Sequence, residues 1–337
     1  MPRNQAGRNI HYDDKSLSGY KRTECGDYII HLRSFEGGLE MANETGIVSP
    51  AYTILRCTKP HSSLFYNAYF HTDEFINHVL AKSVEGIRDG RQISYEAFKW
   101  LGIPYCHPSE QAKIAGLFVS LERRIEKQRQ LVESLKKYKR GVVLAILSHQ
   151  ISFSCPNGRQ YSDWTNCTLQ DAVDFLDGQR KPLESADRAK RQGPYPYYGA
   201  SGIIDYIDDY LFDEPLLLLG EDGANIINRS TPLCFIATGK YWVNNHAHVM
   251  RPKKGHNIIF LCEYLESLDY TRYNTGTAQP KLNQEKCRNI ELILPCYEEQ
   301  CCIASYLSSF GHKMRQEQIM LDQLQVFKHG LLQQMFI

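Results

Sequence analysis

The feature that most constrains this fold is a repeat of the motif Glu-Gln-x-x-Ile-Ala. It occurs at residues 110–115 and again at 299–304, an offset of 189 positions. At the same offset, residues 110–148 align with residues 299–337 without a gap. An internal repeat of this kind indicates that one structural unit occurs twice, and it governs how every other segment is interpreted.

Both copies have the sequence period of a coiled-coil helix. Apolar residues recur at alternating steps of three and four, which predicts two long helices whose apolar stripes need a partner. Each copy is the natural partner of the other. The residues expected to begin the helices and form their interface are Glu110, Gln111, Ile114, Leu121, Ile125 and Leu135, with Glu299, Gln300, Ile303, Phe310, Met314 and Leu324.

Two polar positions interrupt the apolar stripe at equivalent places in both copies. They are Gln128 with Glu317, and Lys139 with Lys328. A polar residue in such a stripe costs stability but can fix the register of the helices. Alternatively, these long side chains simply extend to water. The sequence leaves both interpretations open.

The repeat extends upstream of the helices. GIVSPAYTILR at 46–56 matches YWVNNHAHVMR at 241–251 in pattern, at an offset of 195. Each is preceded by an apolar run with a glycine turn, and followed by a helical stretch, a loop, a short apolar segment and the long helix. This order predicts an α+β fold of two mixed α/β lobes alternating with two long helices. The expected boundaries are 1–105, 106–150, 151–295 and 296–337.

The two lobes are unequal in sequence. The second has a further segment, residues 161–206, before its first shared strand. By the repeat offset, the counterpart of that segment would begin before residue 1. We therefore expect the first lobe to lack roughly 35 residues at its start.

Composition and motifs exclude several classes of protein. No stretch is long and apolar enough for a membrane span, and the first residues do not form a secretory signal, so we expect a cytoplasmic protein. The eleven cysteines include no C-x-x-C pair, which argues against structural zinc. Phosphate-binding and dinucleotide-binding glycine motifs are absent from the sequence, so we expect no cofactor on this chain.

A histidine pair, His246 and His248, suggests either a metal site or a general base. The matching positions of the first copy are Ala51 and Thr53, which have neither function. A duplicated catalytic site would not lose both groups. We therefore expect no catalytic residue and no metal ligand.

The combined pattern resembles the specificity subunit of a type I restriction–modification system. Each long helix begins with Glu-Gln-x-x-Ile-Ala and ends in Leu-x-x-x-Lys-x-Gly, and each follows a lobe. The second copy supplies YYGASGIIDYIDDYLFDE, WVNNHAHVMRP, NTGTAQPKL and LPCYEEQCCIASYL. The resemblance covers nearly the whole chain, except that the first lobe is short.

The resemblance implies a non-catalytic subunit. Each lobe would be a target recognition domain that reads one half of a bipartite site in double-stranded DNA. The two helices would pack antiparallel as a spacer and would bind two methyltransferase subunits, with two restriction subunits joining for cleavage. Those partners, rather than this chain, would use S-adenosylmethionine, ATP and Mg²⁺.

Loops between the predicted elements offer the side chains for DNA contact. Arg and Lys suit guanine, Asn and Gln suit adenine, and hydroxyl groups suit phosphates. The second-lobe candidates are Gln179, Arg180, Lys181, Tyr197, Tyr198, Ser201, Asp222, Asn244, Asn245, His246, Thr277, Gln279 and Lys281. The first-lobe candidates are Arg33, Ser34, Ser49, Tyr52, Arg88 and Arg91.

Other interpretations of the same residues stay open. Any single Asn or Gln can cap a turn instead of reading a base, and the tyrosines can be core residues. Residues 155–298 hold 15 Lys and Arg against 19 Asp and Glu, whereas residues 110–148 hold 9 Lys and Arg against 4 Glu. DNA affinity would therefore depend on a local basic stripe and on partners. The alternatives are a truncated form that reads one half-site or assembles poorly, a coiled-coil scaffold that binds no DNA, and an enzyme that uses His246 and His248.

Overall fold

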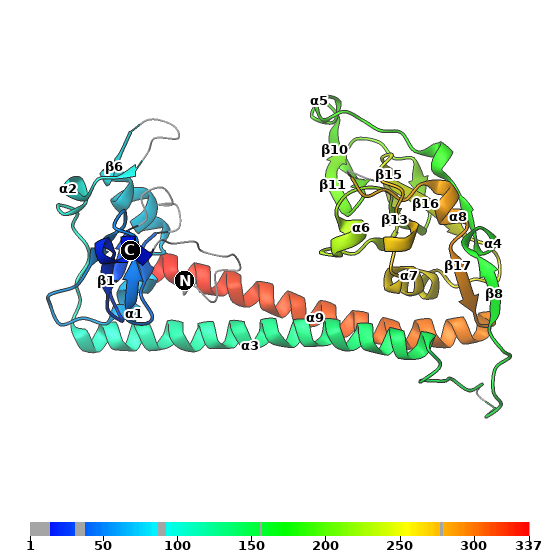
Figure 1. The fold of residues 1–337 in the computed structure, drawn as a ribbon, viewed down its shortest axis with the longest axis horizontal. Coiled ribbons are helices and arrows are strands. Elements are labelled where there is room, and N and C mark those ends of the chain that lie inside the picture. The colour runs from blue at the N-terminus through cyan, green and yellow to red at the C-terminus, as the bar shows by residue number, and fades with distance from the viewer. Residues whose placement is uncertain (1–13, 31–37, 87–91, 156, 277–278, 337) are drawn as a thin grey trace. The chain divides into compact units, whose positions relative to one another are not determined.

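The computed structural model describes residues 14–30, 38–86, 92–155, 157–276 and 279–336. The chain divides into two compact units, Met1–Val132 with Glu317–Ile337, and Glu133–Gln316. Each unit combines one β-containing lobe with a part of both long helices (Figure 1). Within the described ranges, no helix is long and apolar enough to cross a membrane.

The two predicted long helices are confirmed. Helix α3 runs over Pro108–Leu147, 40 residues, and helix α9 over Tyr297–Met335, 39 residues. In the first unit Leu121 and Ile125 pack against Leu321, and Phe118 stacks with Phe336 near the end of the chain. The order of these contacts shows that the helices are antiparallel. The predicted α+β fold, with two lobes and two long helices that pack together, is therefore confirmed.

The same pairing continues in the second unit. There the rings of Tyr138 and Phe310 lie 5.6 Å apart, and Ile146 shares a core with Ile303 and Leu307. The apolar interface residues predicted from the sequence are all buried or half-buried: Ile114, Leu121, Ile125, Leu135, Ile303, Phe310, Met314 and Leu324.

The polar positions of the stripe have partners. Gln128 Nε2 donates to Glu317 Oε2 at 2.7 Å and to the Glu317 carbonyl oxygen at 3.0 Å, so equivalent residues of the two copies meet each other. Lys139 forms an ion pair with Glu263, and Lys328 forms one with Glu122. A hydrogen bond between helices favours the register-fixing interpretation at Gln128. The lysines reach carboxylates as well as solvent.

The second lobe consists of two four-stranded sheets and a two-stranded one, in the orders β11-β10-β15-β12, β14-β13-β16-β9 and β17-β8. Its strands are β8 Thr165–Thr168, β9 Val173–Phe175, β10 Gln192–Gly199, β11 Gly202–Ile207, β12 Phe212–Asp213, β13 Leu216–Gly220, β14 Cys234–Ala237, β15 Lys240–Val243, β16 Ala247–Pro252 and β17 Glu291–Leu294. Its helices are α4 Leu169–Ala172, α5 Ser185–Arg188, α6 Asn225–Asn228, α7 Ile258–Ser267 and α8 Gln284–Arg288, with short 3₁₀ turns at Asp177–Gln179 and Thr271–Tyr273.

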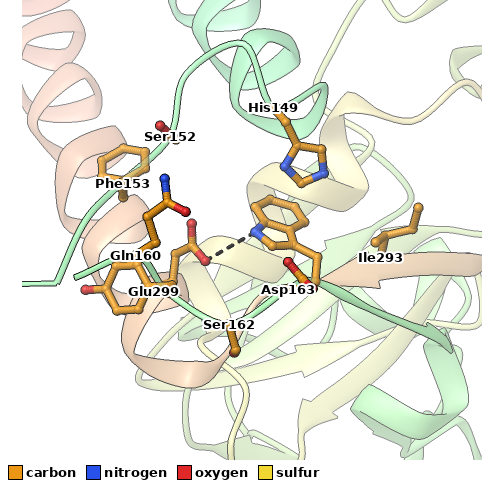
Figure 2. A pocket seen from close by; sticks show the side chains of 10 residues that line it. His149, Ser152, Phe153, Gln160, Ser162, Asp163, Ile293 and Glu299 are labelled. Carbon is orange, nitrogen blue, oxygen red and sulfur yellow. Dashed lines mark hydrogen bonds between the residues drawn. The ribbon is translucent and has the colours of Figure 1, made fainter.

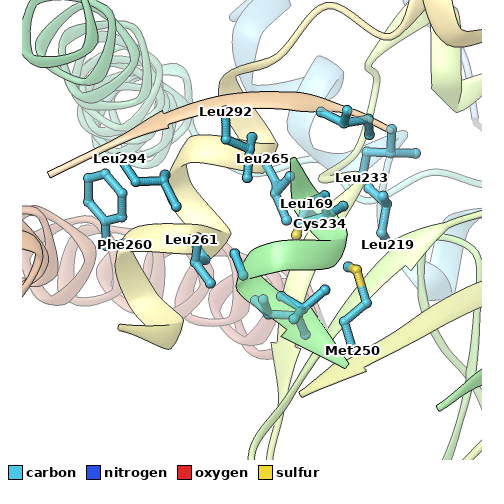
Figure 3. Close-up of a cluster of buried hydrophobic side chains, with 14 of the residues drawn as sticks. Leu169, Leu219, Leu233, Cys234, Met250, Phe260, Leu261, Leu265, Leu292 and Leu294 are labelled. Carbon is cyan, nitrogen blue, oxygen red and sulfur yellow. The ribbon is translucent and has the colours of Figure 1, made fainter. Parts of the chain in front are cut away.

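Strand β13 explains where the core of this lobe lies. All five of its residues are buried, so both faces of the strand are covered. Leu217 and Leu219 point into the core formed with α7, β17 and the helix ends, part of which Figure 3 shows. Leu216 and Leu218 belong to a second core. A continuous apolar run with cores on both faces is typical of a central strand.

The first lobe is smaller in its described part. Its strands are β1 Lys21–Thr23, β2 Tyr28–Ile30, β3 Glu40–Met41, β4 Gly46–Val48, β5 Thr53–Leu55, β6 Val84–Glu85 and β7 Gln92–Ile93. They pair as β3-β2-β5, β1-β4 and β6-β7. Its helical elements are α1 Ser63–Tyr69 and α2 Tyr95–Phe98, with a 3₁₀ turn at Asp14–Gly19, a π-helical segment at Glu74–Val79 and a 3₁₀ turn at Leu80–Ser83.

The two lobes share strand register as well as element order. In the first, Tyr28 lies opposite Leu55, and in the second, Leu217 lies opposite Met250. These pairs are related by the two offsets seen in the sequence, 189 and 195. Helix α1 follows β5 as α7 follows β16. The strand–loop–strand–helix order deduced from the repeat is therefore present in both lobes.

The recurrent glutamine of the motif has one role in both copies. Gln111 accepts a hydrogen bond from the Ser62 backbone N–H at 2.8 Å and donates to the Cys106 carbonyl oxygen at 2.9 Å. Gln300 accepts from the Asn257 backbone N–H and donates to the Pro295 carbonyl oxygen, both at 2.9 Å.

These two glutamine contacts join each long helix to its lobe. Ser62 and Asn257 are the N-cap residues of α1 and α7, and both glutamine side chains are buried. A buried amide with both of its ends bonded to backbone fixes position strongly, because breaking the bonds leaves buried groups unpaired. We call this arrangement the glutamine lock.

Candidate nucleic-acid interface

Loops that are far apart in sequence meet at one end of the second lobe. The Glu221 N–H donates to the His246 carbonyl oxygen at 2.8 Å, and the Leu282 N–H donates to the Glu221 carbonyl oxygen at 2.7 Å. Asp222 forms an isolated β-bridge with Lys281. The loops at 221–223, 244–246 and 279–282 therefore form one surface, which holds several of the candidates for DNA contact.

Two further loops join this surface. The Lys181 N–H donates to the Val243 carbonyl oxygen at 3.4 Å. A Cβ on Gly220 would lie 2.6 Å from the Ala200 carbonyl oxygen, so the β10–β11 turn sits directly against the end of β13. Only glycine permits that approach. The loops at 179–181 and 199–202 thus complete a set of five converging loops.

An ion-pair network fixes the centre of these loops. Arg180 Nη1 donates to Glu221 Oε2 and to the Ala247 carbonyl oxygen, both at 2.8 Å. Lys281 Nζ lies 3.3 Å from Glu221 Oε1. The Arg180 and Glu221 side chains are only 14% and 13% exposed. In this arrangement Arg180 holds loops together instead of facing a ligand, and Glu221 accepts from it at the centre of the network.

The DNA-contact candidates of the second lobe differ in exposure. Arg180, Tyr198 and Asp222 are half-buried, whereas Tyr197 and Asn244 are buried; Thr277 lies outside the described residues. The exposed candidates, which can reach a ligand directly, are Gln179, Lys181, Ser201, Asn245, His246, Gln279 and Lys281.

The buried candidates have internal partners. Tyr197 Oη accepts from the Leu183 N–H at 2.9 Å, and Asn244 Oδ1 accepts from the His246 N–H at 2.8 Å. The Tyr198 ring packs against Tyr241, and burial raises the pKa of Tyr198. These three residues shape the loops, as the turn-capping and core interpretations anticipated for such side chains.

The two histidines point to different partners. The exposed His246 lies 2.7 Å from Asp222 Oδ2 through Nδ1. The buried His248 has Nδ1 2.7 Å from Asp177 Oδ2 and Nε2 2.8 Å from the Leu282 carbonyl oxygen. Among the described residues, no group of three or more His, Cys, Asp or Glu side chains could hold a metal ion.

His248 is a buried cation. Neither of its acceptors can donate, so both ring nitrogens carry protons. Burial acts to lower the pKa of His248, but hydrogen bonds with Asp177 and Cys287 outweigh that effect and raise it to about 10. Asp177 also accepts from the Val249 N–H at 2.9 Å and from Gln284 Nε2 at 2.8 Å. The His248–Asp177 pair therefore joins the segment before Gln179 to the loop that ends at Leu282.

The first-lobe candidates are only partly described. Arg33, Ser34, Arg88 and Arg91 lie outside the described residues. Ser49 and Tyr52 lie in the loop between β4 and β5, and the 195-residue offset relates this loop to that between β15 and β16. Both are half-buried, and the Tyr52 carbonyl oxygen accepts from Lys21 Nζ at 2.7 Å.

Basic side chains of α3 gather beside the second lobe. A cavity of about 390 Å³ is lined by Lys136, Lys139 and Arg140 of α3 and by Arg229 of the lobe, with Glu263 and Glu266 as the acidic groups. Ser230 and Thr231 add hydroxyl groups. This places part of the basic stripe expected from the helix composition next to an otherwise acidic lobe.

Comparison with known proteins gives the sequence relationship. Residues 161–325 match the family model described as "Type I restriction modification DNA specificity domain". A putative type I restriction enzyme specificity subunit of Haemophilus influenzae is 33% identical over 142 residues, 42% of this chain and 36% of the relative. The EcoprrI specificity subunit of Escherichia coli is 26% identical over 167 residues, 45% of this chain and 40% of the relative. Each match thus spans well under half the length of the curated relative.

Solved structures give the fold relationship. The S subunit of a type I restriction–modification system from M. genitalium aligns with a TM-score of 0.60 and 16% identity, over 98% of this chain and 86% of that one. A chain from a study of the assembly and conformational transition of the type I R-M system aligns with a TM-score of 0.55 and 16% identity, over 93% and 82%. In sequence, residues 161–325 are therefore similar to type I restriction–modification DNA specificity domains, and the chain as a whole has the fold of the solved S subunit from M. genitalium.

Proposed function

We propose that this chain is the DNA specificity subunit of a type I restriction–modification complex. Each lobe reads one half of a bipartite site in double-stranded DNA, and the paired helices α3 and α9 hold the lobes. The observation that carries the proposal is the convergence of five loops, with seven exposed polar candidates, in the part of the chain that matches the specificity-domain family.

The chain recognises and positions, and its partners perform the chemistry. Two methyltransferase subunits bring S-adenosylmethionine, and two restriction subunits bring ATP and Mg²⁺, as the family resemblance implies. The complex acts on cytoplasmic DNA. The basic cavity between α3 and Arg229 supports this role, because contacts to phosphates supply most of the affinity of DNA-binding proteins.

The first lobe is proposed to read its half-site with a reduced set of elements. In its described part, β1, β2, β3, β4 and β5 correspond to β12, β13, β14, β15 and β16. The alternative is that only the second lobe specifies bases. Both forms use the same helices.

Methylome sequencing tests the proposal. The chain is expressed with its methyltransferase subunit, and methylated motifs are compared with those of cells that lack the chain. A bipartite motif that depends on the chain supports the proposal in full. A motif with one specified half means that the second lobe reads alone, and no dependent motif would refute the specificity role.

A matched pair of variants separates DNA reading from a scaffold that binds only proteins. Gln279→Ala with Lys181→Ala removes exposed polar groups of the converging loops, whereas Gln325→Ala removes an exposed amide of α9. The first variant should change or weaken one half of the motif while the methyltransferase subunit still binds. The Gln325→Ala control should leave the motif intact. A scaffold would tolerate both.

A further inference from the structure

A cavity of about 440 Å³ lies in the second unit, away from the converging loops. It forms where the chain leaves α3 and approaches β8, beside the first turn of α9 (Figure 2). Aromatic side chains line it, among them Phe153, Tyr161 and Trp164, and so do the carboxylates of Asp163 and Glu299. The function proposed above makes no use of this cavity.

Glu299 is the unusual residue of the cavity. It is only 5% exposed, and Trp164 Nε1 donates to its Oε2 at 3.2 Å. Its other carboxylate oxygen accepts no hydrogen bond from the described residues. Burial raises the pKa of Glu299, and the Trp164 hydrogen bond acts in the opposite direction. The carboxylate of Glu299 therefore has capacity for further donors, because an ionised carboxylate accepts about four hydrogen bonds.

The surroundings of Glu299 suit a cation. None of the ten residues that line the cavity is Lys or Arg, and the one basic side chain among them is the imidazole of His149. The His149 ring stands edge-on to Trp164, with centroids 4.7 Å apart, and leaves the cavity walled by aromatic groups. An aromatic wall next to a buried carboxylate attracts guanidinium or ammonium groups through cation–π contacts and charge-assisted hydrogen bonds.

The rim of the cavity suits a protein. Ile293 lines the cavity and is 45% exposed, although it is large and apolar. Ile151 and Tyr297, which lie close in the chain to the lining residues Ser152 and Glu299, are 36% and 47% exposed. Apolar surface around a polar pocket is typical of interfaces in which one anchoring side chain is buried. Arginine is the basic residue most used as such an anchor, since its planar group stacks on aromatic rings and donates two parallel hydrogen bonds.

We propose that this cavity receives an arginine side chain of a partner protein, with Glu299 as the counter-ion and Trp164 as the stacking surface. The equivalent of Glu299 in the first copy is Glu110, which is exposed. The site therefore belongs to the second copy. The proposal rests on the proposed function only in taking the partner to be a subunit of the same complex.

A direct test uses the full chain alone, with N-acetyl-arginine methylamide as the probe. The chain has three tryptophans, so the indole N–H signal of Trp164 is assigned by NMR with a Trp164→Phe variant. The arginine probe should shift that signal saturably, with a dissociation constant of about 1 mM, as for a single small group. The isosteric citrulline compound should not. No shift with arginine, or an equal shift with citrulline, would overturn the proposal.

A second test uses the assembled complex. Glu299→Gln keeps an oxygen that accepts from Trp164 and removes the charge, whereas Glu298→Gln changes an exposed neighbour on the same helix. Glu299→Gln should abolish the arginine-induced shift and weaken binding of the methyltransferase subunit about tenfold. Its thermal midpoint should stay at or above that of the unaltered chain, and Glu298→Gln should bind within about twofold of it.

The outcomes separate the two proposals. If Glu299→Gln assembles as well as the unaltered chain, the cavity does not receive a partner's arginine, whatever the probe shows. If the unaltered chain does not bind the methyltransferase subunit, the proposed function fails. The probe titration then decides whether the cavity selects a guanidinium group.

Discussion

The two copies of the repeat differ most where they would meet a ligand and least where a lobe joins its helix. Register between β2 and β5 matches register between β13 and β16, and Gln111 and Gln300 make equivalent bonds. In contrast, the β4–β5 and β15–β16 loops differ in sequence: Ser49, Pro50 and Ala51 stand where the second lobe has Asn244, Asn245 and His246. The shared part is therefore the support, and the variable part is the surface that it presents.

This difference teaches how specificity can change without a change of architecture. Loops tolerate substitution because few buried groups depend on them. The lock cannot vary in the same way, because a buried amide must find both a donor and an acceptor. Four pairs of measurements would break or sharpen the comparison.

The largest expected effect is on the glutamine lock. Gln111→Ala and Gln300→Ala each leave a buried N–H and a carbonyl oxygen without their partner, and each should lower the free energy of unfolding by about 3 kcal/mol. Urea unfolding measures the loss, and Gln325→Ala on the surface of α9 serves as the control. If one copy lost less than half as much as the other, the two locks would not be equivalent.

An arginine–carboxylate pair should distinguish the copies. Arg56 bonds Asp27 in the first lobe, and Arg251, which the 195-residue offset relates to Arg56, bonds Glu214 in the second. The Asp27 side chain is 3% exposed and also accepts from the Glu24 N–H, whereas Glu214 is 41% exposed. The bond from Arg56 holds the pKa of Asp27 below its usual value.

Removing each carboxylate tests that distinction. Asp27→Ala should cost about 2 kcal/mol because a buried network is lost. Glu214→Ala should cost less than about 1 kcal/mol, as is usual for an exposed ion pair. Both are measured by urea unfolding at the same pH. Equal losses of unfolding free energy would show that burial does not determine how much each arginine–carboxylate pair stabilises its lobe.

The pH dependence of stability should differ between lobes. The folded-state pKa of His248, about 10, lies above its unfolded value, so the stabilisation is complete below about pH 6.5 and is lost as the pH rises toward 10. Between pH 7 and 9 the second lobe should lose about 2.5 kcal/mol. Hydrogen exchange of β13 and β16 measures this loss.

The first lobe supplies the internal control for that titration. Thr53 occupies the position equivalent to His248, so β2 and β5 should show no matching loss over the same range. His248→Asn should remove the slope from the second lobe. A slope that persists in this variant would assign the titration to another group.

The smallest effects are expected at exposed lysines of the converging loops. Lys181→Ala and Lys281→Ala should each weaken DNA binding a few-fold and reduce the slope of log K against log salt by about one. Lys286→Ala, on the exposed part of α8, is the control. If both loop variants left the slope unchanged, these lysines would not contact phosphates.

The sequence predicted the parts of the molecule that depend on periodicity. Two long helices, their partner residues and the strand–loop–strand–helix order follow from spacing, because apolar residues must recur on the buried face of each element. The candidate loops also converge, since the order of strands brings their ends together. The predicted domain boundaries and the DNA-contacting roles stay predictions.

Side-chain roles within the site could not be predicted in the same way. Arg180 and Gln279 look alike as candidates in the sequence, but Arg180 is enclosed by Glu221 and Asp177, and Gln279 is exposed. Such a distinction depends on which residues, distant in sequence, supply counter-charges. The repeated glutamine is the exception, because its structural role has a sequence signal. A polar residue that recurs at the start of two apolar helices indicates a buried hydrogen bond.

The contact between Gln128 and Glu317 has a consequence for how such a chain evolves. Positions 189 residues apart touch each other there, so two identical copies would place the same residue on both sides. Two glutamates would repel and two apolar residues would not fix an alignment, whereas a donor facing an acceptor needs the sides to differ. Because both copies belong to one chain, each can carry a different residue at this position. A duplicated ancestor is therefore expected to become asymmetric first where equivalent positions of the two helices face each other.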